Sequence, residues 1–337
     1  MKNILILHTG GTIGMVPQKD KKGALVLTKN AQHFLELVPE LKKIAKIQVE
    51  VLDDLDSSNV TPTHWIKWLK TLRFHYKKYD GFIFTHGTDS MAYTGSAFSF
   101  ALGQIDKPIV LTGSQRPLSV IRTDARDNLI NSVEMACRGP KEVTLCFGNQ
   151  LLRANRSTKF SATDYIAFES FNFPRLAQIG VEVESNWQNF SAKEIVKPGK
   201  PLWQTNFNEK VFCFKIFPGI SSEILLSTIN NKACEGIVLE AFGSGNVPSI
   251  DDSVLAMIRR AQQLGKPVVI VSQCPHGRVN LDLYDCGVKA KKAGAISAGD
   301  MTREAAVVKL MHSLGLGLKG SKLRAYFLKN ICGERSL

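Results

Sequence analysis

The chain is organised as short runs of β-branched or aliphatic residues that alternate with longer segments in which apolar residues recur at helical spacing, as in Trp65–Tyr76 and Met91–Leu102. Runs that are apolar at every position are typical of parallel strands covered by helices on both faces. The pattern predicts an α/β fold whose larger N-terminal domain is a doubly wound parallel sheet of the flavodoxin or Rossmann type. The strands predicted for this sheet are Ile4–Leu7, Ile47–Leu52, Gly81–Phe84, Ile109–Leu111 and Val143–Phe147.

Polar clusters rich in glycine and hydroxyl side chains follow each of these predicted strands. Ligands of doubly wound sheets bind beyond the carboxyl ends of the strands, where such clusters would gather. The sequence therefore predicts one ligand site along this edge of the sheet. The clusters are Thr9–Thr12, Asp53–Ser58, Thr85–Asp89, Thr112–Arg116 and Gly148–Lys159.

The chain of 337 residues is long enough for two domains at roughly 100–200 residues each. We predict an N-terminal catalytic α/β domain over residues 1–185 and a linker over 186–205, which lacks a sustained apolar period and contains two prolines. A smaller C-terminal α/β domain is predicted over 206–337. Its predicted strands are Val211–Phe217, Gly236–Glu240 and Pro267–Val271, and its predicted helices include Ser222–Asn230 and Ser253–Leu264.

Charge and cysteine usage exclude several classes of protein. The formal net charge is +13, but the lysines are spread along the chain without a nucleic-acid-binding motif, so we predict a basic surface and no nucleic-acid partner. No stretch approaches the roughly 18 consecutive apolar residues of a membrane span. The seven cysteines are scattered and never form a C-x-x-C pair. We therefore expect no disulfide framework, no metal site, and a reducing, cytoplasmic compartment.

Two threonines are presented in the same way by two predicted strands. The Thr-Gly-Gly-Thr-Ile motif over 9–13 offers Thr12, and the His-Gly-Thr-Asp motif over 86–89 offers Thr88 together with Asp89. Glycines before a hydroxyl nucleophile let a substrate approach the backbone closely. Two alternatives remain for the first motif: Thr12 caps a helix, or the loop holds a dinucleotide. A dinucleotide fingerprint needs glycine at position 9 and an acidic residue about 20 positions further on, and this chain has neither.

At these residues the chain resembles the L-asparaginase family of the bacterial type, specifically its cytoplasmic, type I branch. Two spaced motifs, each preceded by a strand and about seventy residues apart, make this a specific signal. The resemblance covers nearly the whole length, through Thr9–Ile13, Asp56–Ser58, His86–Ser90, Thr112–Pro117, Arg156–Lys159, Gly243–Asn246 and the region Gly299–Thr302.

The resemblance implies a role for each matching residue. Thr12 would be the nucleophile, and Thr88 and Lys159 would exchange protons while Asp89 fixes the geometry and binds the substrate α-ammonium. Ser57 and Ser58 would hold the α-carboxylate. Ser114 would line the amide pocket. The resemblance implies neither a metal nor a cofactor.

Each of these residues also has an ordinary structural interpretation. Thr88 and Asp89 are favoured N-caps for a helix beginning near Ser90. Lys159 alone would be an exposed loop lysine. Ser57 and Ser58 could cap a helix as well, but the pair Thr61-Pro62 already supplies an N-cap and a first-turn proline, so the two serines are surplus to capping.

The chain departs from the family pattern in the loop over residues 13–30. The family places a tyrosine there, against the nucleophile, whereas this chain has no tyrosine before Tyr76, and the matching position is Ala24 or Leu25. Glycines and the lysine-rich segment Lys19–Lys22 still predict a lid that excludes water. In the family, a neighbouring subunit completes the site, which implies a homodimer or homotetramer. We expect Asn246 to be contributed in this way, and we hypothesise that Tyr284 supplies the missing hydroxyl.

The sequence thus predicts an L-asparaginase that hydrolyses the side-chain amide of free L-asparagine to L-aspartate and ammonia. One alternative is the related amidotransferase subunit, which supplies ammonia to tRNA-linked glutamate. That subunit usually carries an N-terminal extension, and here the first strand begins at residue 3 or 4. The other alternative is a homologue that binds ligands without catalysis. The choice between asparagine and glutamine depends on one methylene, worth about 1–3 kcal/mol in a pocket, and stays open.

Overall fold

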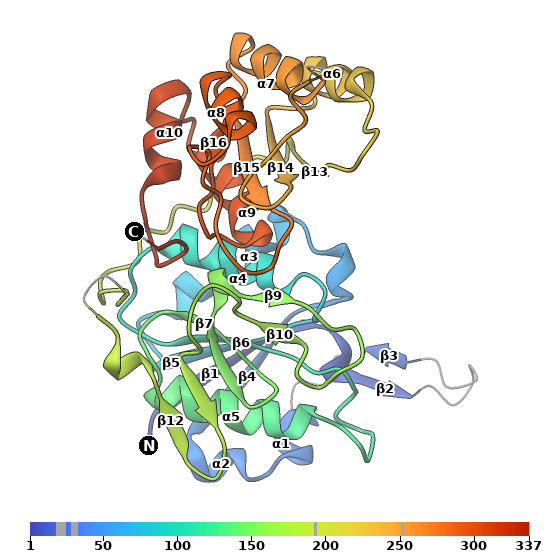
Figure 1. Cartoon of the computed structure of the whole chain (residues 1–337). Helices are drawn as coiled ribbons and strands as arrows, with labels where there is room; N and C mark the ends of the chain where they lie inside the picture. The colour runs from blue at the N-terminus through green and yellow to red at the C-terminus, as the bar shows by residue number, and fades with distance from the viewer. Residues whose placement is uncertain (18–24, 28–32, 192–193, 251–252, 337) are drawn as a thin grey trace. The chain divides into compact units, whose positions relative to one another are not determined.

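A computed structural model describes the chain except for residues 18–24, 28–32, 192–193, 251–252 and 337 (Figure 1). The chain divides into two compact units, Met1–Thr205 and Asn206–Leu337. Each unit has its own sheet and its own apolar core. The predicted division into a larger and a smaller α/β part is confirmed.

The first unit is built on an eight-stranded sheet with the order β12-β11-β8-β7-β6-β5-β1-β4. From β4 to β7 the strands are parallel. Numbered by their succession along the chain, these five strands have the order 2-1-3-4-5, which is the flavodoxin-like winding. The predicted doubly wound sheet is therefore confirmed for this part. The parallel strands are β1 (Asn3–Gly10), β4 (Lys46–Leu55), β5 (Gly81–Thr85), β6 (Ile109–Thr112) and β7 (Val143–Phe147).

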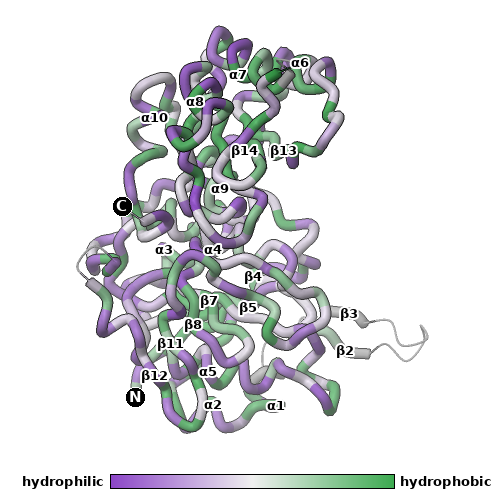
Figure 2. The backbone as a smooth tube through the Cα atoms, viewed as in Figure 1, coloured by the Kyte–Doolittle hydropathy of each residue, from purple (hydrophilic) through white to green (hydrophobic). Residues whose placement is uncertain are grey.

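Helices cover both faces of the inner strands, which are buried along almost their whole length (Figures 1 and 2). The edge strand β4 differs, because polar residues alternate with apolar ones and most of its positions are half-buried. In β1 the side chains of Ile4 and Ile6 join the core cluster that includes Leu129 and Val133 of α5. On the other face lie α3 and α4, with the buried Trp68 and Phe98. The helices of this unit are α1 (His33–Leu37), α2 (Leu41–Ile44), α3 (Pro62–His75), α4 (Met91–Leu102) and α5 (Ala125–Arg138).

Beyond β7 the sheet continues as an antiparallel edge, which the sequence analysis did not predict. Gly148 and Asn149 both have positive φ, 57° and 62°, and turn the chain from β7 into β8 (Gln150–Arg153). Two central residues with positive φ match the twist of a tight hairpin. The expectation that Gly148–Lys159 forms one strand-edge cluster is therefore wrong, because it contains a strand. The edge is completed by β11 (Ala177–Ile179) and β12 (Val183–Ser185).

Short elements complete the first unit. Two small antiparallel sheets are formed by β2 (Met15–Pro17) with β3 (Leu25–Leu27) and by β9 (Thr158–Lys159) with β10 (Phe168–Glu169). The 3-10 helices are η1 (Thr12–Gly14), η2 (Ser57–Asn59), η3 (Ala154–Arg156) and η4 (Trp187–Asn189).

The segment predicted as a linker packs along the first unit. The backbone N–H of Leu202 donates to Leu102 O at 2.9 Å, and that of Gln204 donates to Ala101 O at 2.8 Å, both at the end of α4. The first compact unit accordingly extends to Thr205. Its function as a connection between domains stays a prediction.

The second unit contains a four-stranded parallel sheet with the order β13-β14-β15-β16. No helix in the described part of the chain is long and apolar enough to cross a bilayer. The strands are β13 (Val211–Lys215), β14 (Gly236–Ala241), β15 (Val268–Ser272) and β16 (Ile296–Ser297). The helices are α6 (Ser222–Asn230), α7 (Ser253–Gln263), α8 (Asp285–Lys292), α9 (Arg303–Gly315) and α10 (Gly320–Leu328).

A fully buried ion pair ties the C-terminal segment to the second unit. Lys309 of α9 pairs with Glu334, and both side chains have no exposed surface. The Lys309 ammonium also donates to Lys329 O at 2.6 Å, and Glu334 accepts backbone N–H bonds from Ile331 and Cys332. Burial alone would raise the pKa of the Glu334 carboxyl, but the Lys309 charge and the backbone donors outweigh it and hold this pKa below its ordinary value.

We expect Glu334→Ala to lower the free energy of unfolding by about 3–5 kcal/mol, because it removes the carboxylate that neutralises the buried charge of Lys309. Urea unfolding at pH 7 measures the loss, and Glu209→Ala, at an exposed site of the same unit, is the control. Because the pKa of Glu334 is lowered on folding, the pair stabilises the protein above the ordinary glutamate pKa of about 4.3, and this contribution is lost as the pH falls through the folded value. An unchanged unfolding free energy at pH 7 would contradict this account.

Candidate active site

The two threonine motifs follow β1 and β5, which are neighbours in the sheet at the point where the strand order reverses. This is the switch point where doubly wound sheets bind ligands. Gly11 has a φ of 82°, and a Cβ on it would lie 2.3 Å from the backbone nitrogen of Gly87. The backbones of the two loops are therefore in contact. Thr12 and Thr88 each come directly after one of these touching glycines, so the structure brings the two motifs together as predicted.

Ser57 joins the same cluster from the loop after β4. A Cβ on Gly87 would lie 2.6 Å from Ser57 Oγ, so only glycine fits beside this buried hydroxyl. The Asp89 N–H donates to Ser57 Oγ at 3.1 Å, and the Ser90 hydroxyl donates to Ser57 O at 2.6 Å. The loops after three adjacent strands thus meet at one place.

Lys159 reaches the second motif from β9, outside the main sheet. Its ammonium donates to Thr88 Oγ1 at 2.7 Å and to Asp89 Oδ1 at 2.7 Å. The Thr88 side chain is nearly buried and that of Lys159 is 20% exposed, whereas Asp89 is 63% exposed. The arrangement places an amine against a shielded hydroxyl and leaves a carboxylate open to an incoming cationic group.

Helix capping does not account for these residues. The N-cap of α4 is Ser90, so neither Thr88 nor Asp89 caps it. The N-cap of η1 is Gly11, which excludes capping by Thr12. The Thr12 hydroxyl makes no hydrogen bond to any residue that the structure describes.

The serine pair is likewise surplus to capping, as the sequence predicted. Thr61 is the N-cap of α3 and Pro62 is its first residue. Ser58 is exposed, and both its N–H and its hydroxyl donate to Asp56 Oδ1, at 2.8 and 2.7 Å. The backbone and side-chain hydrogen bonds from Ser58 lower the pKa of Asp56. Ser57 therefore lies inside the cluster, and Ser58 lies at its open side.

The loop after β6 carries Ser114, which is buried and donates to Arg116 O at 2.6 Å. The loop is held by Asp124, whose carboxylate accepts the N–H groups of Gln115 and Arg116, and by Asn128, which donates to Gly113 O at 3.0 Å. Burial raises the pKa of Asp124, against the backbone hydrogen bonds that lower it. The sequence analysis missed these two positioning residues. The signal that could have revealed them is a pair of polar side chains one turn apart, at the start of α5.

The predicted lid is described only in part. Its two short strands β2 and β3 pair with each other. Lys19–Lys22, Gly23 and Ala24 lie outside the described residues, and Leu25 is described by its backbone alone. The prediction that this loop closes over the site stays a prediction.

The residues expected from a neighbouring subunit lie on adjacent loops of the second unit. Asn246 forms a β-bridge with Phe242, and its Oδ1 accepts from Cys286 Sγ at 3.3 Å. Tyr284 is the N-cap of α8, and its side chain is 55% exposed. Their participation in a site stays a prediction.

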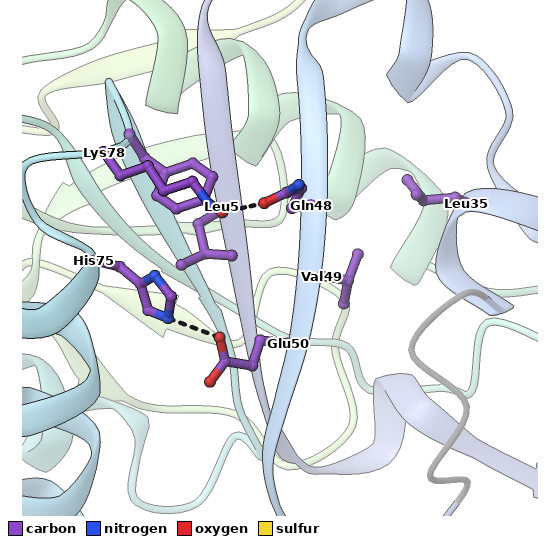
Figure 3. A pocket seen from close by; sticks show the side chains of 8 residues that line it. Leu5, Leu35, Gln48, Val49, Glu50, His75 and Lys78 are labelled. Atoms are coloured by element: carbon purple, nitrogen blue, oxygen red, sulfur yellow. Dashed lines mark hydrogen bonds and ion pairs between the residues drawn. The ribbon is translucent and has the colours of Figure 1, made fainter.

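A cavity in the first unit lies away from these residues, beside the edge strand β4 (Figure 3). Its polar groups already pair with each other: His75 Nε2 lies 2.8 Å from Glu50 Oε2, and the Tyr79 hydroxyl donates to Gln48 Oε1. None of the predicted catalytic residues is among the described residues that line it. The motif loops at the switch point are therefore the better candidate site.

Comparison with known proteins agrees with this geometry. Residues 3–191 match the family "Asparaginase, N-terminal", and residues 210–327 match the "Glutaminase/Asparaginase C-terminal domain". The chain is 35% identical to L-asparaginase 1 of Escherichia coli K12 over 99% of this chain and 98% of that protein. It is also 35% identical to one subunit of the glutamyl-tRNA(Gln) amidotransferase of Pyrococcus abyssi, over 99% of this chain and 77% of the relative. The solved structure of the thermostable L-asparaginase from Thermococcus kodakarensis matches with a TM-score of 0.91 at 32% identity, covering 99% of both chains. Motif geometry, length and similarity together place this chain in the bacterial-type L-asparaginase family, in its type I branch.

Proposed function

We propose that this protein is an L-asparaginase, which hydrolyses the side-chain amide of free L-asparagine through a threonine nucleophile. The observation that carries the proposal is the contact of Lys159 Nζ with Thr88 Oγ1 and Asp89 Oδ1, each at 2.7 Å. This group adjoins the loop of Thr12 through the touching glycines. A nucleophile and a proton-exchanging pair are parts that metal-free amide hydrolysis needs, and the exposed carboxylate can bind the α-ammonium of an amino-acid substrate.

The reaction proceeds in two steps. In the first, Thr12 Oγ attacks the side-chain carbonyl carbon of asparagine, a C–O bond forms, the C–N bond breaks, and the nitrogen leaves as ammonia after gaining a proton. In the second, water attacks the acyl carbon, the bond to Thr12 breaks, and aspartate is released. Protons pass through Thr88 and Lys159. Backbone N–H groups of the motif loops stabilise the oxyanion of each step.

The substrate is oriented by its α-substituents. Ser57 and Ser58 bind the α-carboxylate, Asp89 binds the α-ammonium, and the Ser114 loop lines the amide pocket.

We propose a homodimer or homotetramer in which a neighbouring subunit contributes Asn246 and Tyr284, in a reducing, cytoplasmic compartment. A structure with bound aspartate tests the subunit contribution: Tyr284 far from Thr12 Oγ in every copy would remove it.

A second candidate is a subunit that supplies ammonia to tRNA-linked glutamate. The 35% sequence identity with the Pyrococcus amidotransferase subunit favours it. In that case the same motifs would release ammonia for direct use in the tRNA-linked reaction. A homologue that binds its ligand without turnover is the third.

Ammonia release by the purified full-length protein separates these candidates. We expect L-asparagine alone to give ammonia and aspartate in equal amounts, without tRNA, ATP or a partner protein, and L-glutamine is assayed in parallel. Release that depends on glutamate-charged tRNA and a partner fraction would support the second candidate. Binding of aspartate without any release of ammonia would support the third, and either outcome would overturn the proposed function.

A further inference from the structure

His86 lies beneath the second motif and is 1% exposed, with both ring nitrogens bonded inside the protein. Its Nδ1 lies 2.6 Å from Gly87 O, and its Nε2 lies 3.0 Å from Thr94 Oγ1. The ring also meets Trp68 edge-on, with centroids 5.5 Å apart. The imidazole is therefore enclosed between the motif and the helices α3 and α4.

The direction of every hydrogen bond in this group is fixed by chemistry. A carbonyl oxygen only accepts, so the proton sits on Nδ1 of His86 and points at Gly87 O. In a neutral ring Nε2 then accepts, and the Thr94 hydroxyl donates to it. Thr94 Oγ1 in turn accepts from Trp65 Nε1 at 2.9 Å. Burial lowers the pKa of His86 to about 4, which keeps the ring neutral at pH 7.

The His86 bond fixes the peptide group between Gly87 and Thr88. The described chain contains no cis peptide bond, so the N–H of Thr88 points opposite to Gly87 O. Because His86 holds that oxygen toward the packed side chains of α3 and α4, the N–H faces away from them. Among the described residues, the Thr88 N–H makes no hydrogen bond. A backbone donor is thus left unused beside the hydroxyl of Thr88.

We infer that His86 is a positioning residue, which holds Gly87 O so that the Thr88 N–H is aimed at the oxyanion formed when the nucleophile attacks. The inference deepens the proposed function and rests on it. His86 does not touch the substrate; it acts through one peptide group. Fixing a donor before the reaction matters because a donor that must reorient during the step stabilises the transition state less.

The kinetic test compares four variants with the wild type. His86→Leu removes the Nδ1 donor, whereas His86→Asn keeps an N–H donor in the position of Nδ1. Thr94→Val removes the hydroxyl that donates to His86 Nε2 while nearly preserving the side-chain volume. Thr94→Ser, which keeps the hydroxyl, is its matched control. We expect His86→Leu to lower kcat for L-asparagine by about 100-fold, in the range seen when one oxyanion donor is lost. His86→Asn should recover most of this loss, and Thr94→Val should fall between Thr94→Ser and His86→Leu.

A purely structural role predicts a different outcome. The affinity for the product L-aspartate, measured by calorimetry, should stay within about twofold of wild type in each folded variant. The reason is that Ser57, Ser58 and Asp89 hold the α-carboxylate and α-ammonium of aspartate. Parallel losses of kcat and aspartate affinity would overturn the inference, as would wild-type kcat in Thr94→Val if His86→Leu fails to fold.

A second readout does not depend on activity. The ¹⁵N shifts of the His86 ring, assigned by their loss in His86→Asn, should show a protonated Nδ1 and an unprotonated Nε2 at pH 7. The opposite tautomer would overturn the inference even in an active enzyme. If the wild type shows this tautomer but releases no ammonia from any amide, the proposed function fails and the geometry of His86 stands.

Discussion

Thr12→Ala is expected to abolish the release of ammonia from L-asparagine, with a fall in kcat of about 10⁴-fold or more. The reason is that alanine offers no atom that can form the acyl bond, so the remaining groups can only bind and polarise the amide. The fold should survive, because Thr12 caps no helix and its hydroxyl bonds nothing in the described part of the chain. Steady-state ammonia release and the melting temperature are measured on the same preparation.

Two controls sharpen this result. Thr71→Ala, at a half-buried position of α3, removes the same atoms away from the site and should leave kcat unchanged. Thr12→Ser restores a hydroxyl and should recover measurable turnover. Near-normal turnover in folded Thr12→Ala protein would refute the assignment of the nucleophile.

Lys159→Met is expected to lower kcat by about 10²–10⁴-fold, the size of a lost proton-transfer group. Methionine preserves the length and much of the volume of the side chain but cannot exchange a proton with Thr88. It also removes the ion pair with Asp89, whose carboxylate remains exposed and available to the substrate ammonium. The kinetic constants for L-asparagine and the affinity for L-aspartate are measured together, and the loss should fall mainly on kcat.

The double variant Lys159→Met, Thr88→Ala tests whether the two residues act as one unit. If they do, the double variant should be barely slower than the slower single variant, because residues that share one function are strongly non-additive. Lys141→Met, at an exposed lysine before β7, is the control. Additive losses would show that Lys159 and Thr88 contribute separately and would contradict the shared proton path.

The pattern of apolar runs predicted the five parallel strands of the first unit, and helical spacing predicted α3 and α4, because burial on both faces makes the inner strands almost wholly apolar. It did not reveal β8, which lies inside a stretch of mixed polarity. The signal for this hairpin was local: a Gly-Asn pair, both with positive φ, between two buried strands. Such a turn joins antiparallel neighbours, and a pattern of parallel strands gives no indication of it.

The candidate site was predictable as a set of residue types but not as a set of contacts. Motif spacing indicated Thr12 and Thr88, and the family resemblance added Lys159. The contact of Gly11 with Gly87, by contrast, depends on strand order, which no local pattern contains. The sequence did not indicate Asp124, because its partners are backbone N–H groups, whose positions a sequence pattern does not reveal. The contribution of a neighbouring copy of the chain depends on how the subunits assemble, and it is predicted from the family resemblance alone.

The contact between Gly11 and Gly87 has a consequence for how such an enzyme can change. The loops that carry Thr12 and Thr88, the two threonines that we propose as reactive, touch backbone against backbone, and no substitution that adds even a methyl group fits between them. Mutation therefore has no means of tuning this gap in small increments. We expect new substrate preferences in this lineage to arise from the surrounding loops, while the two glycines stay unaltered.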